Sequence, residues 1–182
     1  MTVRRCAALL AAMLQLILAP TARVEFAMKT GILLRMHVVA QDDTPAMQQV
    51  KFAVRDAVCA AYAERAEDGR TMLMNTQQHL PALAAAAEEA ARAAGFTGTV
   101  AVTLEQRDFD ARTLDGVDVP AGRYPALMIL LGDARGRNCW GLIDPSLALR
   151  CAMAGEAEDI EWDWSLTALW EALAGLFRKE AL

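Results

Sequence analysis

Residues 37–45, with the sequence HVVAQDDTP, hold the side chains of this chain that are best suited by type and spacing to chemistry. His37 is one of two histidines and could act as a general base, with Asp43 orienting its imidazole and a nucleophile supplied from elsewhere. That arrangement would make the protein a small hydrolase. The chain has no Gly-x-Ser-x-Gly nucleophile elbow, however. The favoured interpretation is therefore a strand histidine held by a backbone or carboxylate hydrogen bond.

A metal site in the same segment is not predicted. His37, Asp42 and Asp43 would supply nitrogen and oxygen ligands, but the second histidine, His79, falls in a separate helical region. The four cysteines include no Cys-x-x-Cys spacing, which argues against zinc. We expect neither a metal nor a cofactor.

Composition indicates one globular domain with extensions. The chain has 182 residues, is 55% hydrophobic and only 6% aromatic, so its core must be mostly aliphatic. The net charge is −5, and no basic stretch is dense enough to follow a phosphate backbone. Nucleic acid is therefore not an expected partner.

Residues 1–27 have the layout of a secretory signal peptide or N-terminal membrane anchor. Two arginines in the first five residues precede an apolar run, residues 6–19, that is interrupted only by Gln15. Those 14 residues would span about 21 Å as a helix, short of the roughly 30 Å bilayer core. The pattern predicts export, with Ala22 the preferred cleavage point and retention as an anchor left open.

The elements that must position residues 37–45 are a strand and a helix. Residues 31–40 alternate as a strand does, and Thr44 and Pro45 suit the N-cap and the first position of a helix over 45–65. Asp42 and Asp43 lie where the helix dipole favours negative charge. Much of the segment is thus explained as chemistry of a helix start.

The rest of the chain predicts a second helix and then strands. The second helix covers about 72–94 and should be kinked or split by Pro81. Expected strands follow, with the last of them a hairpin partner of the one before: 97–105, 109–114, 124–131 and 138–143. The fold class is therefore α+β, a mainly antiparallel sheet with two to three helices packed on one face, in the order β-α-α-β-β-β-β.

Residues 156–182 form a separate C-terminal region by composition. An acidic linker, residues 156–163, leads into a predicted amphipathic helix over 165–182, which either packs on the domain or contacts a membrane surface or partner. The expected division is 1–27, 28–155 and 156–182.

Three segments, read in order, resemble one family. They are LRMHVVAQDDTPAMQQVKFAVRDAV, VPAGRYPALMILLG and GRNCWGLIDPSL. Together they are similar to the stage II sporulation protein R family of endospore-forming bacteria, and the resemblance covers roughly residues 31–150.

The resemblance implies a signalling role and no enzymatic activity. Members of that family are exported from the forespore into the space between the two membranes that separate it from the mother cell. There they trigger a membrane-embedded aspartic protease, which removes the inhibitory pro-sequence of the mother-cell factor sigma-E. The implied partner is thus that protease, with membrane association through the N-terminus or the C-terminal helix left open.

The chain departs from the family pattern at its cysteines. The family has a cysteine after a double tryptophan, where this chain reads Asn138, Cys139, Trp140, Gly141, and a second one that corresponds to Ala148. Cys139 and Cys151 lie nearby and could form a substitute disulfide, although strand geometry could equally point them apart. Cys59 is expected to be a buried thiol.

Polar and aromatic residues around the matched segments are the candidates for contacting the protease. Adjacent residues of a helix do not face each other, so Arg55 should pair away from Asp56, with a carboxylate such as Asp43 or Asp108. Trp140 is either a packing anchor or an interface hot spot. The predicted contact residues are Arg35, His37, Asp43, Lys51, Arg55, Asp56, Asn138 and Trp140.

Overall fold

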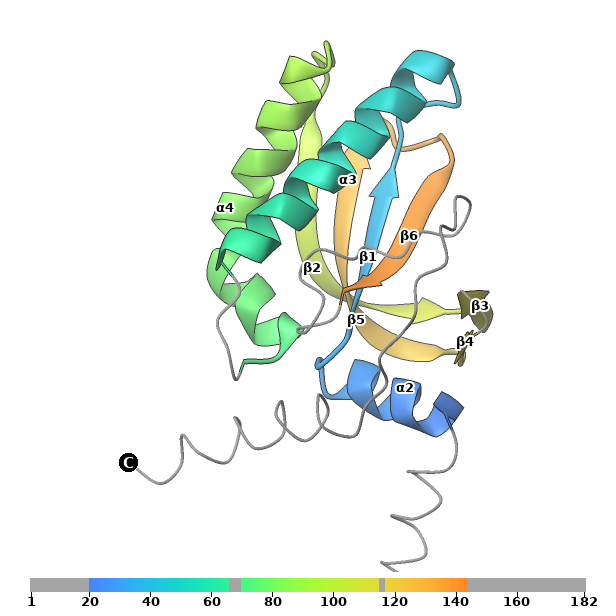
Figure 1. Ribbon diagram of the computed structural model, residues 1–182. Helices are drawn as coiled ribbons and strands as arrows, with labels where there is room; N and C mark the ends of the chain where they lie inside the picture. Colours follow the sequence, from blue (N-terminus) through green and yellow to red (C-terminus); the bar gives the residue numbers. More distant parts are fainter. Residues whose placement is uncertain (1–19, 66–69, 115–116, 144–182) are drawn as a thin grey trace, which may run out of the picture.

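The computed structural model describes residues 20–65, 70–114 and 117–143 (Figure 1). The predicted acidic linker, the predicted C-terminal helix and residues 1–19 lie outside this part of the chain. The elements are α2 (Pro20–Lys29), β1 (Leu34–Val39), α3 (Pro45–Arg65), α4 (Met72–Ala93), β2 (Val100–Phe109), β3 (Arg112–Leu114), β4 (Val117–Val119), β5 (Gly122–Leu131) and β6 (Asn138–Ile143).

Four strands form one mixed sheet in the order β2-β5-β1-β6. β1 is parallel to β5 and antiparallel to β6, while β2 and β5 are antiparallel. The helices α3 and α4 cover one face of this sheet (Figure 1). The predicted α+β class with a mainly antiparallel sheet is confirmed.

The strand pairing corrects one expectation. Residues 138–143 were predicted to pair with residues 124–131, but β1 lies between β5 and β6 and pairs with both. β1 is buried at five of its six positions. A strand that is apolar on one face and occluded on the other belongs in the interior of a sheet, where neighbours satisfy both of its edges.

A small hairpin adds a strand to the predicted order. β2 runs to Phe109, and β3 and β4 then pair with each other as a separate two-stranded sheet. The described chain thus has five strands after α4, where four were expected.

The start of α3 is as the sequence predicts, whereas α4 differs from its prediction. The Thr44 hydroxyl accepts a hydrogen bond from the Met47 backbone N–H at 3.4 Å, which is the expected N-cap contact. α4 is one helix through Pro81 and is not split, with the proline on its exposed side. Tertiary contacts hold α4 together, among them the Tyr62 hydroxyl at 2.5 Å from the Thr76 hydroxyl.

Two cores lie on opposite faces of the sheet. The first core fills the space beneath α3 and α4 with aliphatic side chains such as Val38, Val54, Leu83, Leu127 and Ile129, all with no exposed area. The second core lies on the other face, against α2 and the β3–β4 hairpin. Its buried members are Val24, Ala27, Met28, Ile32, Leu33, Val119, Tyr124, Trp140 and Leu142.

Residues 20–27, which the sequence assigned to the signal or anchor, form most of α2. Val24 and Ala27 of this helix are buried in the second core. In the part of the chain that the structure describes, no helix combines the length and apolarity that a membrane crossing requires.

Candidate functional site

The structure divides the predicted contact residues between the two faces of the sheet. Alternation along β1 turns Arg35 and His37 away from α3. His37 pairs with Trp140 of β6 across the antiparallel ladder, so these side chains share that face. Lys51, Arg55 and Asp56 instead lie on α3, which covers the opposite face. The eight residues therefore do not form one site.

Arg35 is the most deeply buried charged side chain described, with 1% of its surface exposed. Its guanidinium carbon lies 4.0 Å from the ring centroid of Phe109 and 4.8 Å from that of Trp140. These are cation–π distances. Burial, followed by repulsion from Arg112, lowers the pKa of Arg35 to about 10, so the side chain remains positively charged at neutral pH.

His37 completes this cluster, which we name the Arg35–His37 cluster and define as Arg35, His37, Phe109, Asn138 and Trp140. The imidazole stacks on Phe109 with ring centroids 4.9 Å apart. Its Nδ1 lies 2.7 Å from Nδ2 of Asn138. An amide nitrogen can only donate, so Nδ1 accepts, and in the neutral ring the proton is on Nε2.

The protonation of His37 is set by its surroundings. Burial, then the positive charge of Arg35, lowers the pKa of His37 to about 4. The imidazole is consequently neutral at pH 7 and a weak base there. The hydrogen bond predicted for this histidine exists, but its partner is an amide side chain, where a backbone group or carboxylate was expected.

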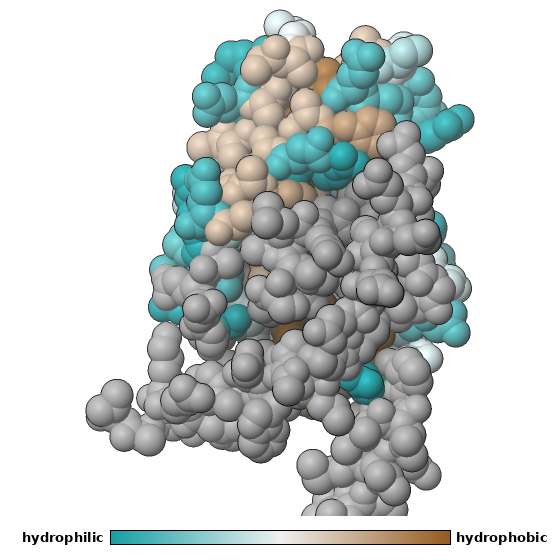
Figure 2. Space-filling view, in the orientation of Figure 1, coloured by the Kyte–Doolittle hydropathy of each residue, from teal (hydrophilic) through white to brown (hydrophobic). Residues whose placement is uncertain are grey.

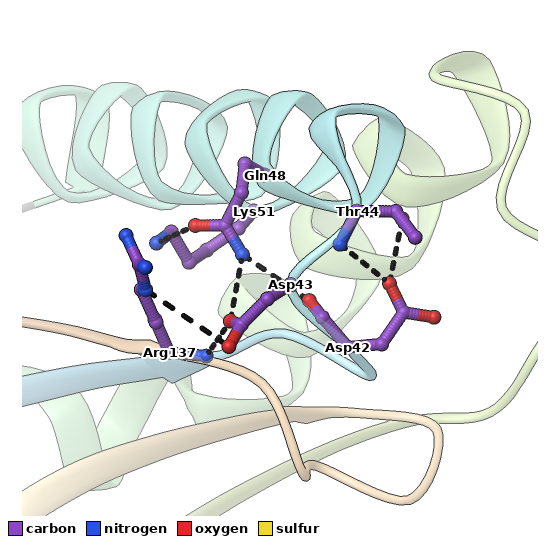
Figure 3. Close-up of polar contacts among 6 residues, drawn as sticks. All are labelled: Asp42, Asp43, Thr44, Gln48, Lys51 and Arg137. Atoms are coloured by element: carbon purple, nitrogen blue, oxygen red, sulfur yellow. Dashed lines mark hydrogen bonds and ion pairs between the residues drawn. The ribbon is translucent and has the colours of Figure 1, made fainter.

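Asp43 lies at the β1–α3 turn and makes contacts of its own (Figure 3). One carboxylate oxygen accepts a hydrogen bond from the backbone N–H of Arg137 at 2.6 Å and lies 3.5 Å from the amide nitrogen of Gln48. The other is 3.9 Å from Nε of Arg137. Asp43 therefore joins the turn to the β5–β6 loop, and its hydrogen bonds are separate from those of His37.

Asp42 supports the helix start on the other side of the same turn (Figure 3). Its carboxylate accepts hydrogen bonds from the Thr44 hydroxyl at 2.6 Å and the Thr44 backbone N–H at 3.0 Å. These hydrogen bonds hold the pKa of Asp42 below its usual value. The interpretation as a helix-start residue accounts for the contacts of Asp42, whereas Asp43 also binds Arg137 of the β5–β6 loop.

The β5–β6 loop, residues 132–137, was not predicted to belong to this region. Its Gly136 and Arg135 donate backbone hydrogen bonds to the carbonyls of Ala40 and Gln41 at 2.9 and 3.1 Å. A side chain at Gly136 would collide with the Asp42 carbonyl, so only glycine permits this close approach. The glycines of this loop, Gly132 and Gly136, were the sequence feature that could have indicated a close backbone approach.

Lys51 and Arg55 lie near each other on α3. Lys51 is 4% exposed, donates to the Gln48 side chain at 2.5 Å and lies 4.7 Å from the Phe52 ring centroid. Arg55 contacts Asp56 at 2.5 Å. The prediction that Arg55 pairs away from its neighbour is thus wrong, because a long arginine side chain can bend back to an adjacent exposed carboxylate.

The cysteines also differ from expectation. Cys139 is a buried thiol beneath α3, so the possible bridge to Cys151 is not formed. Burial raises the pKa of this thiol. Strand alternation turns Cys139 into the first core. Cys59 is disulfide-bonded and is not the buried thiol that was expected. Cys151 lies outside the described residues.

Among the described residues, no group of three or more histidine, cysteine or carboxylate side chains is placed to hold a metal ion. His37 has its polar contact with Asn138, and Asp42 has its contacts with Thr44. The polar groups that were considered as ligands thus serve the strand and the helix start.

The fold and these contacts define a small α+β domain with a buried cationic cluster walled by aromatic rings. The chain matches the family model described as Stage II sporulation protein R (spore_II_R) over residues 30–153, and it belongs to that family. The resemblance drawn from three sequence segments is confirmed.

One relative is the Stage II sporulation protein R of Bacillus subtilis (strain 168). It is 28% identical over 130 residues, which cover 68% of this chain and 57% of the relative. The chain thus spans somewhat over half the length of that relative. No solved structure matches the chain.

Proposed function

We propose that this protein is an exported signalling protein that activates a membrane-embedded aspartic protease. The protease then processes the precursor of the mother-cell sigma-E factor. The observation that carries the proposal is the family match over residues 30–153. The apolar segment after the basic N-terminus supports export into the intermembrane space, as a secreted or N-terminally anchored protein.

Activation requires only that the protein bind the active state of the protease more tightly than the inactive state. That interaction needs surface that a partner can reach. Among the predicted contact residues, Arg35, His37, Lys51 and Trp140 are buried. We assign them to the interior, where they shape the domain and do not touch the protease directly.

The exposed residues lie at the β1–α3 turn, along α3 and at the start of β6. Asp43 and Asp56 expose 55% and 64% of their side chains, and Asn138 is also exposed. Arg137, which the sequence did not single out, exposes 81%. Figure 2 shows hydrophilic side chains bordering a paler apolar area over α3 and α4, and the exposed residues of these helices include several alanines. We place the protease contact on this mixed surface.

The alternative, a small exported hydrolase that uses His37 and Asp43, lacks the required contact. His37 is hydrogen-bonded to Asn138, whereas Asp43 is bonded to Arg137. A buried imidazole with a pKa of about 4 is poorly matched to general-base catalysis at neutral pH.

Co-expression of the full chain with the cognate protease and the sigma precursor tests the proposal. Immunoblotting of the precursor should show processing that depends on this chain. An exported, folded chain that produces no processing would contradict the proposed function. His37→Gln should activate as the wild type does, after circular dichroism has established that it folds, whereas abolished activation by a folded variant would favour the hydrolase.

The contact surface has its own test in the same assay. Asp56→Arg reverses an exposed charge and should reduce processing on the order of tenfold, equivalent to about 1.4 kcal/mol of binding free energy. Asp110→Arg, at an exposed position next to Phe109, which packs on the second core on the other face, is the matched control and should leave processing unchanged. Equal processing by the two variants would exclude α3 from the interface.

A further inference from the structure

The β5–β6 loop is fixed to two neighbouring parts of the chain by its own backbone. At its start, the Gly132 N–H donates to the Thr99 carbonyl at 2.8 Å. Further along, the N–H groups of Arg135, Gly136 and Arg137 donate to acceptors in the β1–α3 turn at 3.1, 2.9 and 2.6 Å, the last of them drawn in Figure 3. A short loop with so many paired donors keeps little conformational freedom.

One residue of this loop has a strained backbone. Ala134 has a φ of 50°, in the left-handed region, and among residues 20–65, 70–114 and 117–143 it is the only residue other than glycine with a positive φ. A Cβ in that region costs free energy that glycine would avoid. The next N–H, that of Arg135, turns back to the Gln41 carbonyl. Such strain is typical of places where one particular backbone shape serves a function.

The loop presents two arginines to the solvent. The side chains of Arg135 and Arg137 are each 81% exposed. Nη2 of Arg135 lies 3.3 Å from Asp133, and Nε of Arg137 lies 3.9 Å from Asp43. Surface ion pairs of this kind are weak, so a partner can replace them. Arginines on a rigid backbone lose less freedom on binding, and arginine is enriched among the residues that dominate binding energy.

Carboxylates of a protein suit these arginines better than a dense array of phosphates does. A guanidinium binds a carboxylate through two parallel hydrogen bonds. Asp133 and Asp43 stand beside the arginines with 70% and 55% of their side chains exposed, and the net charge of the chain is −5. These acids repel nucleic acid or an anionic membrane surface. A protein segment can place acidic residues on the arginines and other residues beside the aspartates.

We propose that the β5–β6 loop presents a preformed arginine pair that binds an acidic segment in the exposed part of the membrane-embedded protease. Arg135 and Arg137 supply the charge, and the hydrogen-bonded backbone around Gly136 fixes the direction in which they point. The inference rests on the proposed function, because it takes the protease as the partner. It adds the chemistry of the segment that is recognised.

Binding of the full chain to the purified protease in lipid nanodiscs tests the arginine pair. Arg135→Glu combined with Arg137→Glu should raise Kd about tenfold or more at low salt, and the difference should shrink at high salt, because salt screens surface charges. If the wild type binds and this variant binds equally well, the arginine pair is not the contact and the proposed function stands. If the wild type neither binds nor supports processing of the sigma precursor, the proposed function itself is contradicted.

Arg107→Glu combined with Arg123→Glu is the matched control. These two arginines also form surface ion pairs, at 3.8 and 3.5 Å, and their replacement changes the net charge by the same amount. The control should leave Kd unchanged. An equal rise of Kd in both double variants would show a general effect of charge and would count against the loop.

Gly136→Ala tests whether the shape of the loop matters as well as its charge. A Cβ at this position would collide with the Asp42 carbonyl, so the loop must move although both arginines remain. Kd should rise by about fivefold in a variant that circular dichroism shows to be folded. Ala134→Gly is the matched control and should bind as the wild type does, because glycine adopts a positive φ without strain. An unchanged Kd for Gly136→Ala would overturn the preformed pair.

Nanodiscs of the same anionic lipids without the protease separate the other source of negative charge. The wild type and the variant with Arg135→Glu and Arg137→Glu should bind these empty nanodiscs equally. Binding to empty nanodiscs that is strong in the wild type and lost in the variant would assign the arginines to lipid head groups and would overturn the proposal.

Discussion

The two faces of the four-stranded sheet are buried by different means. Beneath α3 and α4, the first core consists of aliphatic side chains such as Val38 and Leu127, which need only to fill space. On the other face, Arg35 and His37 are held against aromatic rings and a single amide. β1 contributes alternate residues to both faces. One strand therefore connects an aliphatic core to a region that contains a buried positive charge.

The largest expected loss of stability comes from removing a buried side chain from the first core. Leu127→Ala removes a fully buried side chain from β5 and should lower the free energy of unfolding by about 3 kcal/mol, by lost burial and a residual cavity. Urea unfolding should give the same loss at pH 7 and pH 5. Leu80→Ala, at a half-buried position on α4, should cost clearly less, and a pH-dependent Leu127 effect would contradict the contrast between the faces.

The stability that the second face contributes should depend on pH. The folded pKa of His37, about 4, lies below the ordinary value of 6.5, so the folded state binds fewer protons between these values. Its contribution is present above pH 6.5 and is lost as pH falls toward 4, by about 3 kcal/mol in total. Urea unfolding from pH 7 to pH 4 measures this loss.

His37→Gln should remove that part of the pH dependence, while His79→Gln, at a half-buried position on α4, should retain it. The comparison between these variants separates His37 from the carboxylates that titrate over the same range. If the free energy of unfolding had the same pH dependence in the wild type and in His37→Gln, the pH dependence of the second face would not come from this histidine.

The contribution of α2 to the second core is a smaller effect. Val24→Ala should reduce the free energy of unfolding by about 2 kcal/mol, because Val24 is 1% exposed against the sheet. Thr21→Ala, exposed on the same helix, should change it by less than about 0.5 kcal/mol. Equal effects in thermal unfolding would mean that α2 does not pack as described.

The smallest expected effect lies where the two faces meet, at the β1–α3 turn. Asp43→Ala removes the acceptor for the Arg137 backbone N–H and should cost about 1 kcal/mol, since the site is exposed to water. Asp133→Ala removes a carboxylate from the β5–β6 loop that only forms a surface ion pair, and it should cost less. Chemical denaturation that ranks them in the opposite order would contradict the bridging role of Asp43.

The sequence was informative where local rules decide the outcome. The Thr44–Pro45 helix start and the buried positions Met47, Val50 and Val54 follow from capping and helical periodicity. Buried Lys51 was missed because periodicity assigns charged residues to the surface. Its long apolar stem and the Gln48 contact allow burial.

The candidate site was less predictable because it depends on pairing between distant strands. Nothing local to residues 138–143 indicates that their partner is β1 and not the preceding strand. That pairing brings Asn138 and Trp140 to His37, so the aromatic walls and the amide partner could not be deduced from spacing alone. The resemblance identified the family, but it did not indicate that Arg35 and His37 are buried.

The position of β1 has a consequence for the order of events during biosynthesis. The first strand to be made lies inside the sheet, and both of its neighbours, β5 and β6, come from the last part of the described chain. Until residue 143 has been made, β1 has no complete set of partners, and the sheet cannot close. The four-stranded sheet can therefore be completed only when synthesis of the described part of the chain is nearly finished.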